Sequence, residues 1–151
     1  MPTIARSLAV SAAVAAIAAA PAAGATILKG VEAQRGAAAD RLVFTFTGPL
    51  PAKVRTMAVT RVTADGSGAP VRVQGRAFRM VVFAMADAHD ANWKASCAPR
   101  VLTPTLDVLV QAKMTGDFEG QVTYGVGLTR QVTPTIVRRP ASRQIIVLFR
   151  R

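Results

Sequence analysis

The sequence predicts an all-β fold, an antiparallel β-sandwich of about eight strands. Apolar and polar residues alternate with a period of two along most of the chain after residue 39, as in strands that bury one face. Gly, Pro and Asp interrupt this alternation at short intervals, where tight turns need them. The apolar spacing of an amphipathic helix is hard to find between the strands, which favours antiparallel pairing.

The first 25 residues have the three parts of a cleaved secretory signal. Arg6 supplies the positive charge, residues 8–20 form an uncharged apolar run, and residues 23–25 are the small residues that a signal peptidase requires. The alternative, a transmembrane anchor, is disfavoured because the 13 residues of the run are fewer than the about 20 of a span. We therefore expect a secreted protein that begins at Thr26.

Removal of residues 1–25 leaves 126 of the 151 residues, enough for one domain with its own core. The formal net charge falls only from +11 to +10, because Arg6 is the one charge removed. Outside the cell, such a charge favours anionic envelope polymers as partners. Nucleic acid is a poorer candidate because export separates the protein from it. The alternative is a soluble surface that simply carries many scattered arginines. No later apolar run reaches the length of a transmembrane segment.

Residues 26–39 are expected to form an N-terminal edge strand or a linker, since their pattern is the least regular. Residues 40–47 are a clear strand, in which every second residue from Leu42 is Leu or Phe. Pro49 and Pro51 end that strand because proline cannot donate to a β-ladder.

A second long strand is predicted over residues 54–64, which are rich in Val and Thr. Residues 65–68, Asp-Gly-Ser-Gly, are typical of a tight turn in which glycine supplies positive φ. Residues 71–73 would return from it and complete a hairpin. Residues 77–84 alternate again and form the next strand.

Residues 86–106 are the longest irregular stretch and contain the only His, the only Trp and the only Cys of the chain. A short helical turn is expected near Leu106. Loops of this length are often functional, or are lids packed by their own side chains.

Four strands are predicted in the last third of the chain. Residues 108–114 alternate until Gly116 and Asp117 end the strand, and residues 118–128 alternate after it. Residues 136–137 form a short strand. Residues 145–149 are continuously apolar, which predicts a strand buried on both faces.

Gly125 and Gly127 lie on one side of the predicted strand over residues 118–128. Such small residues indicate the close approach of another backbone, or a bulge. No helix follows this Gly-x-Gly, so it is not a nucleotide-binding loop.

Cys97 cannot form an internal disulfide because it is the only cysteine. It is a free thiol, an intermolecular bridge or a small buried hydrophobe. We favour the last, because free cysteine is among the most buried residue types.

Six short strings in order connect the chain to a known family. They are DRLVFTF (40–46) with GPLP (48–51), DGSGAPV (65–71), AHD (88–90), GDFEG (116–120), YGVGL (124–128) and PASR (140–143). In these strings the chain resembles the AMIN-like domain of secreted actinobacterial proteins, and residues 40–151 are assigned to it. The resemblance implies a β-sandwich similar to the AMIN domains found beside cell-wall amidases and in secretins, with the role of holding partners at the envelope through peptidoglycan.

The irregular stretch holds the residues with the most chemistry. A zinc hydrolase needs several His ligands, whereas the chain has only His89. A dyad of His89 with Cys97, or weak metal binding by Asp87, His89 and Asp90, matches no known motif spacing. We expect His89 and Asp90 to bond loop backbone and fix its shape. The chain is therefore predicted to be neither an enzyme nor the carrier of a cofactor or metal.

Asp117 and Glu119 are two residues apart, so in a strand they would share one face. Paired carboxylates can serve a glycosidase. We prefer a strand-entry pair that bonds Arg41 or Arg143 across the sheet, with Asp40 in the same network.

Trp93 and Tyr124 could stack on sugar rings. Aromatic residues make up only 5% of the chain, so an extended lectin platform is not expected. Trp93 is predicted to cap the core beneath the long loop.

These observations predict a secreted, non-catalytic, cell-envelope-associated binding module for peptidoglycan or an anionic wall polymer. The alternative is a small secreted hydrolase or ligand-binding protein that uses the 86–106 loop. The candidate structural or ligand-contact residues are Asp40, Arg41, His89, Asp90, Trp93, Asp117, Glu119 and Arg143.

Overall fold

The computed structural model describes residues 24–151, so the predicted export signal lies almost wholly outside the described residues. These residues form nine strands and no helix, and consequently none of them forms a helix long and apolar enough to cross a membrane. The strands are β1 (Ile27–Arg35), β2 (Ala39–Thr47), β3 (Lys53–Val59), β4 (Ala77–Ala84), β5 (Val101–Leu102), β6 (Leu109–Phe118), β7 (Gln121–Leu128), β8 (Thr135–Arg139) and β9 (Gln144–Arg150).

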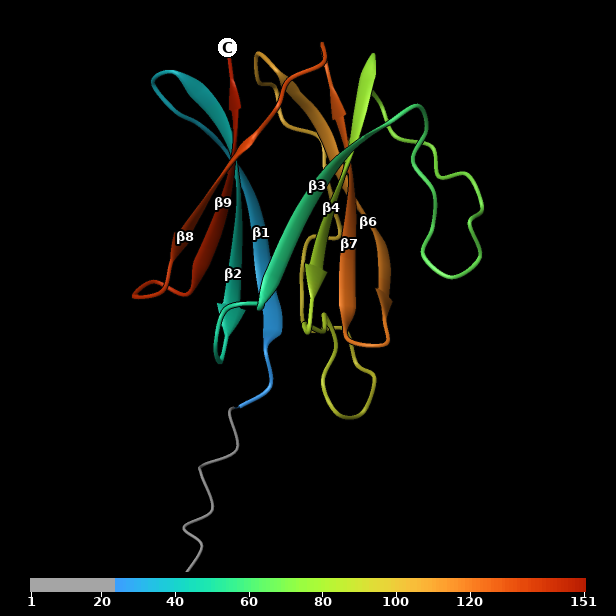
Figure 1. Ribbon diagram of the computed structural model, residues 1–151, viewed down its shortest axis with the longest axis vertical. Helices are drawn as coiled ribbons and strands as arrows, with labels where there is room; N and C mark the ends of the chain where they lie inside the picture. The colour runs from blue at the N-terminus through green and yellow to red at the C-terminus, as the bar shows by residue number, and fades with distance from the viewer. Residues whose placement is uncertain (1–23) are drawn as a thin grey trace, which may run out of the picture.

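The nine strands form two antiparallel sheets that pack as a sandwich (Figure 1). The first sheet has the order β1-β2-β9-β8, and the second has the order β3-β4-β7-β6-β5. The predicted fold class is confirmed. Of the two predictions for residues 26–39, the edge strand is the one observed, because β1 pairs with β2 from Ile27 to Arg35. The sandwich therefore includes residues that precede Asp40.

Aromatic side chains from both sheets meet at the centre of the sandwich. Phe44 of β2 packs edge-on against Phe83 of β4 and Tyr124 of β7, with ring centroids 4.6 and 5.1 Å apart. Phe46 reaches Phe83 at 5.4 Å. These are the alternating positions that the pattern of residues 40–47 predicts, because period-two alternation places them on one face. The edge-to-face pairs add to the area buried.

Cys97 lies in this core with 3% of its surface exposed, and its Sγ is 3.5 Å from the hydroxyl oxygen of Tyr124. Burial raises the pKa of the Cys97 thiol and also raises the pKa of the Tyr124 hydroxyl. The prediction that Cys97 behaves as a small buried hydrophobe is confirmed.

A second, smaller apolar cluster covers the outer face of the five-stranded sheet. Val62 and Val73, from the connection between β3 and β4, pack on Met80 and Val82 of β4. The predicted strand over residues 54–64 is therefore too long, since β3 ends at Val59 and pairs with β4. Residues 71–73 do not form the predicted returning strand. They follow a local turn, in which the N–H of Val71 donates to the carbonyl of Val62 at 2.9 Å.

Two glycines of β7 allow this connection to lie directly on the sheet. A Cβ at Gly127 would collide with the backbone carbonyl of Gln74, and one at Gly125 would collide with Val62. The predicted close approach of another backbone is confirmed at Gly127.

The predicted break at Gly116 and Asp117 is wrong. Strand β6 continues to Phe118, with a bulge between Met114 and Gly116. The turn to β7 is made by Glu119 and Gly120, with φ of 51° and 70°. Positive φ at both central residues is what a tight two-residue hairpin requires. The helical turn expected near Leu106 is also absent from the described residues, and β5 forms instead within the irregular stretch.

We predict that Gly127→Ala lowers the free energy of unfolding by about 2 kcal/mol, because the new methyl group overpacks the contact with Gln74. Gly30→Ala is the matched control, since nothing lies within 4 Å of its new Cβ. It should change the stability by less than about 0.5 kcal/mol. Urea unfolding of the three proteins measures both effects, and equal stability of the two variants would contradict this packing.

Candidate functional site

Residues 86–98 cross from the end of β4 to β1 and tie the two sheets together at one end of the sandwich. The N–H of Asp87 donates to the carbonyl of Thr26 at 3.0 Å, and the N–H of Leu28 donates to the carbonyl of Asp87 at 2.8 Å. The hydroxyl of Ser96 donates to the carbonyl of Leu28 at 2.9 Å. This part of the predicted irregular stretch is therefore ordered by fixed backbone partners, and we name residues 86–98 the strap.

The carboxylate of Asp117, near the end of β6, holds this strap to the second sheet. Its Oδ1 accepts the backbone N–H of Ala88 at 2.8 Å and is 2.9 Å from Nδ1 of His89. Its Oδ2 is 3.7 Å from a guanidinium nitrogen of Arg100. The side chains of His89 and Asp117 are only 13% and 11% exposed. One carboxylate therefore gathers two segments that are distant in sequence.

The prediction that Trp93 caps the core is wrong. Trp93 is 65% exposed and stacks on His89, with ring centroids 4.1 Å apart and planes 9° from parallel. Its φ of 61° is unusual for a residue with a bulky side chain. Such backbone persists only where neighbouring bonds hold it, and it is common at ligand-binding positions.

Asp90 supplies the bonds that hold Trp93 in this conformation. Its Oδ1 accepts the backbone N–H groups of Asn92 at 2.9 Å and Lys94 at 3.0 Å. The N–H of Trp93 donates to the carbonyl of Asp90 at 2.9 Å. The prediction that Asp90 bonds loop backbone is confirmed, whereas His89 bonds a carboxylate instead.

An open hollow of about 410 Å³ lies beside the stacked pair. It is lined by His89, Trp93, Arg100, Met114, Thr115, Gly116 and Asp117. An aromatic face, a cation and hydrogen-bonding groups therefore converge on one concave surface, as in sites that bind small polar molecules. We name this surface the Trp93 site.

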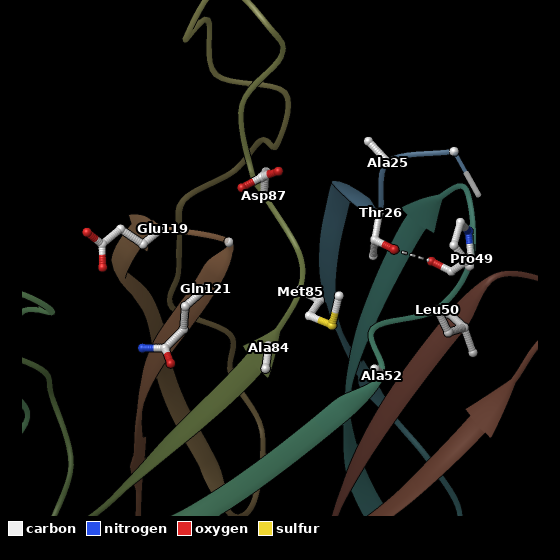
Figure 2. A pocket seen from close by; sticks show the side chains of 12 residues that line it. Ala25, Thr26, Pro49, Leu50, Ala52, Ala84, Met85, Asp87, Glu119 and Gln121 are labelled. Carbon is white, nitrogen blue, oxygen red and sulfur yellow. Dashed lines mark hydrogen bonds between the residues drawn. The ribbon is translucent and has the colours of Figure 1, made fainter. Parts of the chain in front are cut away.

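A larger hollow of about 700 Å³ opens at the same end of the sandwich (Figure 2). Its lining is mainly apolar and comes from the segment before β1, the β2–β3 connection, the end of β4 and the β6–β7 turn. Figure 2 shows Met85 among the lining side chains, with Thr26 bonded to the carbonyl of Pro49 at 2.9 Å. Asp87 lines this hollow, whereas His89, two residues later in the strap, lines the Trp93 site.

Three side chains of the strap and β6 have ligand atoms within 4.8 Å of one another: Asp87, His89 and Asp117. This set differs from the predicted set of Asp87, His89 and Asp90, because Asp90 is engaged by its own turn. A cation there would have to compete with the His89–Asp117 bond and with the nearby positive charge of Arg100.

The predicted alternative of a Cys97–His89 dyad gains no support from the contacts within residues 24–151. Cys97 pairs with the Tyr124 hydroxyl inside the core, whereas Nδ1 of His89 faces Asp117. A nucleophile must lie within hydrogen-bond reach of its base and be accessible to substrate.

Asp40 lies at the opposite end of the sandwich and is fully buried. Its Oδ2 accepts the backbone N–H groups of Val108 at 2.6 Å and Leu109 at 3.0 Å, while Arg151 lies 3.5 Å from its Oδ1. Asp40 therefore joins β2 to the start of β6. The predicted network of Asp40 with Asp117 is wrong, because Asp117 lies at the far end of β6.

The predicted bonds from Asp117 to Arg41 or Arg143 are also wrong. Arg41 lies in β2 of the other sheet, and Arg143 lies in the β8–β9 turn with φ of 54°. Glu119 is exposed in the β6–β7 turn, so it does not share a strand face with Asp117. The paired-carboxylate interpretation fails because the turn falls at Glu119 and Gly120, three residues later than predicted.

Two residues that the sequence analysis missed take part in this region. Arg100 joins the Trp93 site through Asp117, and no local pattern marks it among the many arginines. The carboxylate of Asp65 accepts hydrogen bonds from the side chains of Thr123 and Gln121 in β7. The backbone N–H of Asp65 donates to the carbonyl of Thr115 at the β6 bulge. The Asp-Gly string at residues 65–66 indicated a turn but not this contact.

Hydrogen bonds from the N–H groups of Lys94 and Asn92 hold the pKa of Asp90 below its ordinary 3.8. We predict that the turn is fully held at neutral pH and loosens only as pH falls through this lowered pKa. NMR shifts of the Asn92 and Lys94 amides measure the midpoint. Asp90→Asn, which keeps an acceptor oxygen but cannot titrate, should abolish the transition. A midpoint at or above 3.8 would contradict these bonds.

Comparison with protein families adds an independent observation. The model of the AMIN-like domain matches residues 26–148, which include every strand from β1 to β8 and most of β9. Comparison with curated proteins gives no match, and comparison with solved structures gives none. The family match covers the same sandwich that the strand pairing defines. The chain belongs to the AMIN-like domain family.

Proposed function

We propose that this protein is a secreted, non-catalytic module that binds peptidoglycan at the cell envelope through the Trp93 site. Membership of the AMIN-like family indicates a binding module associated with the envelope. The observation that carries the finer proposal is the exposed Trp93 ring, stacked on His89 beside a polar hollow.

The geometry suits a glycan for a physical reason. Sugar rings present flat C–H faces that pack on an aromatic ring, and an exposed Trp gains from losing contact with water. Stacking on His89 and the Asp90 turn fix the Trp93 ring before binding, so little conformational entropy is lost when the ligand binds.

The polar groups of the hollow add selectivity to the stacking contact. Arg100 is 46% exposed and can pair with a carboxylate, which the stem peptides of peptidoglycan carry. The net charge of +10 after signal removal also draws the module towards an anionic wall. Binding should therefore weaken as salt rises. Export through the predicted signal would place the module in that compartment.

A second candidate function is the binding of a small apolar ligand. The observation that favours it is the mainly apolar hollow of about 700 Å³ beside Asp87, a size typical of ligand pockets. A hydrolase would in addition need an accessible nucleophile beside His89. An anionic wall polymer is the alternative partner for the basic surface.

We predict that Trp93→Ala weakens binding to purified wall sacculi by about tenfold or more, because aromatic anchors dominate binding energies. Co-sedimentation of purified protein with sacculi at low salt measures this. Met57→Ala is the control, since Met57 is an exposed apolar residue of β3, remote from the Trp93 site. Binding of Trp93→Ala equal to that of Met57→Ala would remove the Trp93 site from the proposal, and no sedimentation of the unmodified protein would refute it.

A further inference from the structure

A third hollow, of about 440 Å³, lies at the end of the sandwich opposite the Trp93 site. It is formed where β3 ends and β4 begins, and β4 reaches the strap only at its other end (Figure 1). The lining residues are Ala58, Val59, Thr60, Arg76, Ala77, Phe78 and Gln131. We name it the Arg76 hollow.

Arg79 is buried next to this hollow, with 7% of its surface exposed. It alternates with Val81 and Phe83 on the inner face of β4, as does Ala77, and it pairs across the ladder with Ala58. Both alanines line the hollow. The guanidinium of Arg79 bonds the carbonyl of Val132, the residue after the lining residue Gln131, so Arg79 lies next to the hollow.

The charge of Arg79 is poorly compensated. Its Nη1 donates to the carbonyl of Val132 at 3.0 Å, and its Nε is buried without a hydrogen-bond partner. Burial lowers the pKa of Arg79, yet arginine remains protonated in proteins. A buried charge with one carbonyl partner is costly unless an opposite charge comes close.

No acidic side chain in the described part of the chain supplies that charge. The four strands β3, β4, β8 and β9 contain no Asp or Glu. At this end, Asp107 already pairs with Arg35 at 2.7 Å and with Arg151 at 2.8 Å. Asp40 accepts two backbone N–H groups and faces Arg151. These two acids therefore have other partners, and neither pairs with Arg79.

Exposed arginines occur in, or next in sequence to, the segments that line the same hollow. Arg76 lines it and is exposed, Arg61 follows the lining residue Thr60, and Arg130 precedes Gln131. None of these three arginines forms an ion pair with any of the residues 24–151. The region of the hollow thus combines a buried cation without an ion-pair partner and exposed arginines without ion pairs among the described residues.

We propose that the Arg76 hollow binds an anionic group, a phosphate or a carboxylate, of an extended envelope polymer. Arg76 contacts the anion with charge-assisted hydrogen bonds, Gln131 and Thr60 offer neutral donors, and Arg79 contributes positive charge from beside the hollow. Arg61 and Arg130 attract the neighbouring anionic groups of the polymer. This inference depends on the proposed function only for the envelope origin of the polymer, since it concerns a separate surface.

The test uses two soluble probes, sodium polyphosphate and polygalacturonate, which carry phosphate and carboxylate groups respectively. Calorimetric titration of the purified protein should show saturable binding of at least one probe at low salt, weaker at about 0.15 M salt. Binding of only one probe identifies the anionic group. Binding of neither would overturn the inference.

Arg76→Gln should weaken binding of that probe by about tenfold or more, because it removes a charged hydrogen-bond donor. Lys29→Gln is the matched control, since it removes one exposed positive charge from β1 at the opposite end, and it should change the affinity less than twofold. Equal losses in both variants would mean diffuse attraction by net charge and would refute the site. Arg79→Gln should also weaken binding, and if it fails to fold, Arg76→Gln alone decides.

Trp93→Ala separates this inference from the proposed function. It should leave the affinity for polyphosphate or polygalacturonate unchanged, because the Trp93 site lies at the other end of β4. Sacculi that fail to bind while a probe still binds through Arg76 would refute the proposed function only. A Trp93→Ala variant that loses probe binding would refute the Arg76 hollow as the site.

Discussion

The Asp117 carboxylate is the contact on which the candidate site depends. It lies on a regular strand, and it accepts an N–H from the strap, faces the ring of His89 and attracts Arg100. Without such an acceptor, the strap would lose its side-chain anchor to the second sheet, and the His89 ring would lose its hydrogen-bond partner. Because Trp93 stacks on that ring, the Asp117 carboxylate and the Asp90 turn together fix the position of the exposed aromatic face.

The strands were predictable because period-two alternation is a local property that already determines which side chains face the core. Phe44 and Tyr124 lie where the pattern puts them. The partners of Asp117 were not predictable, since Ala88 is 29 residues away and the bulge after Met114 changes the register. Gly116-Asp117 and Glu119-Gly120 are both typical of turns in sequence. Only the pairing of β6 with β7 places the turn at the second pair.

The outward direction of the Trp93 side chain could not be predicted from the sequence for a different reason. An apolar aromatic residue in a long loop is ordinarily expected to cover the core, and only its positive φ and the Asp90 turn reverse that direction.

The close approach at Gly127 was visible, because the absence of a side chain in an alternating strand is itself a local signal. The uncompensated Arg79 could not be seen, since it depends on where all the acids lie in the fold. The two proposed surfaces lie at opposite ends of the sandwich.

The fluorescence of Trp93 tests the central claim most directly, because it is the only tryptophan of the chain. Titration with soluble muramyl glycan fragments should produce a saturable blue shift of the emission, since stacking on a sugar removes the exposed indole from water. Unchanged emission in the presence of fragments, from protein that sediments with intact sacculi, would contradict the account and place the binding surface elsewhere on the sandwich.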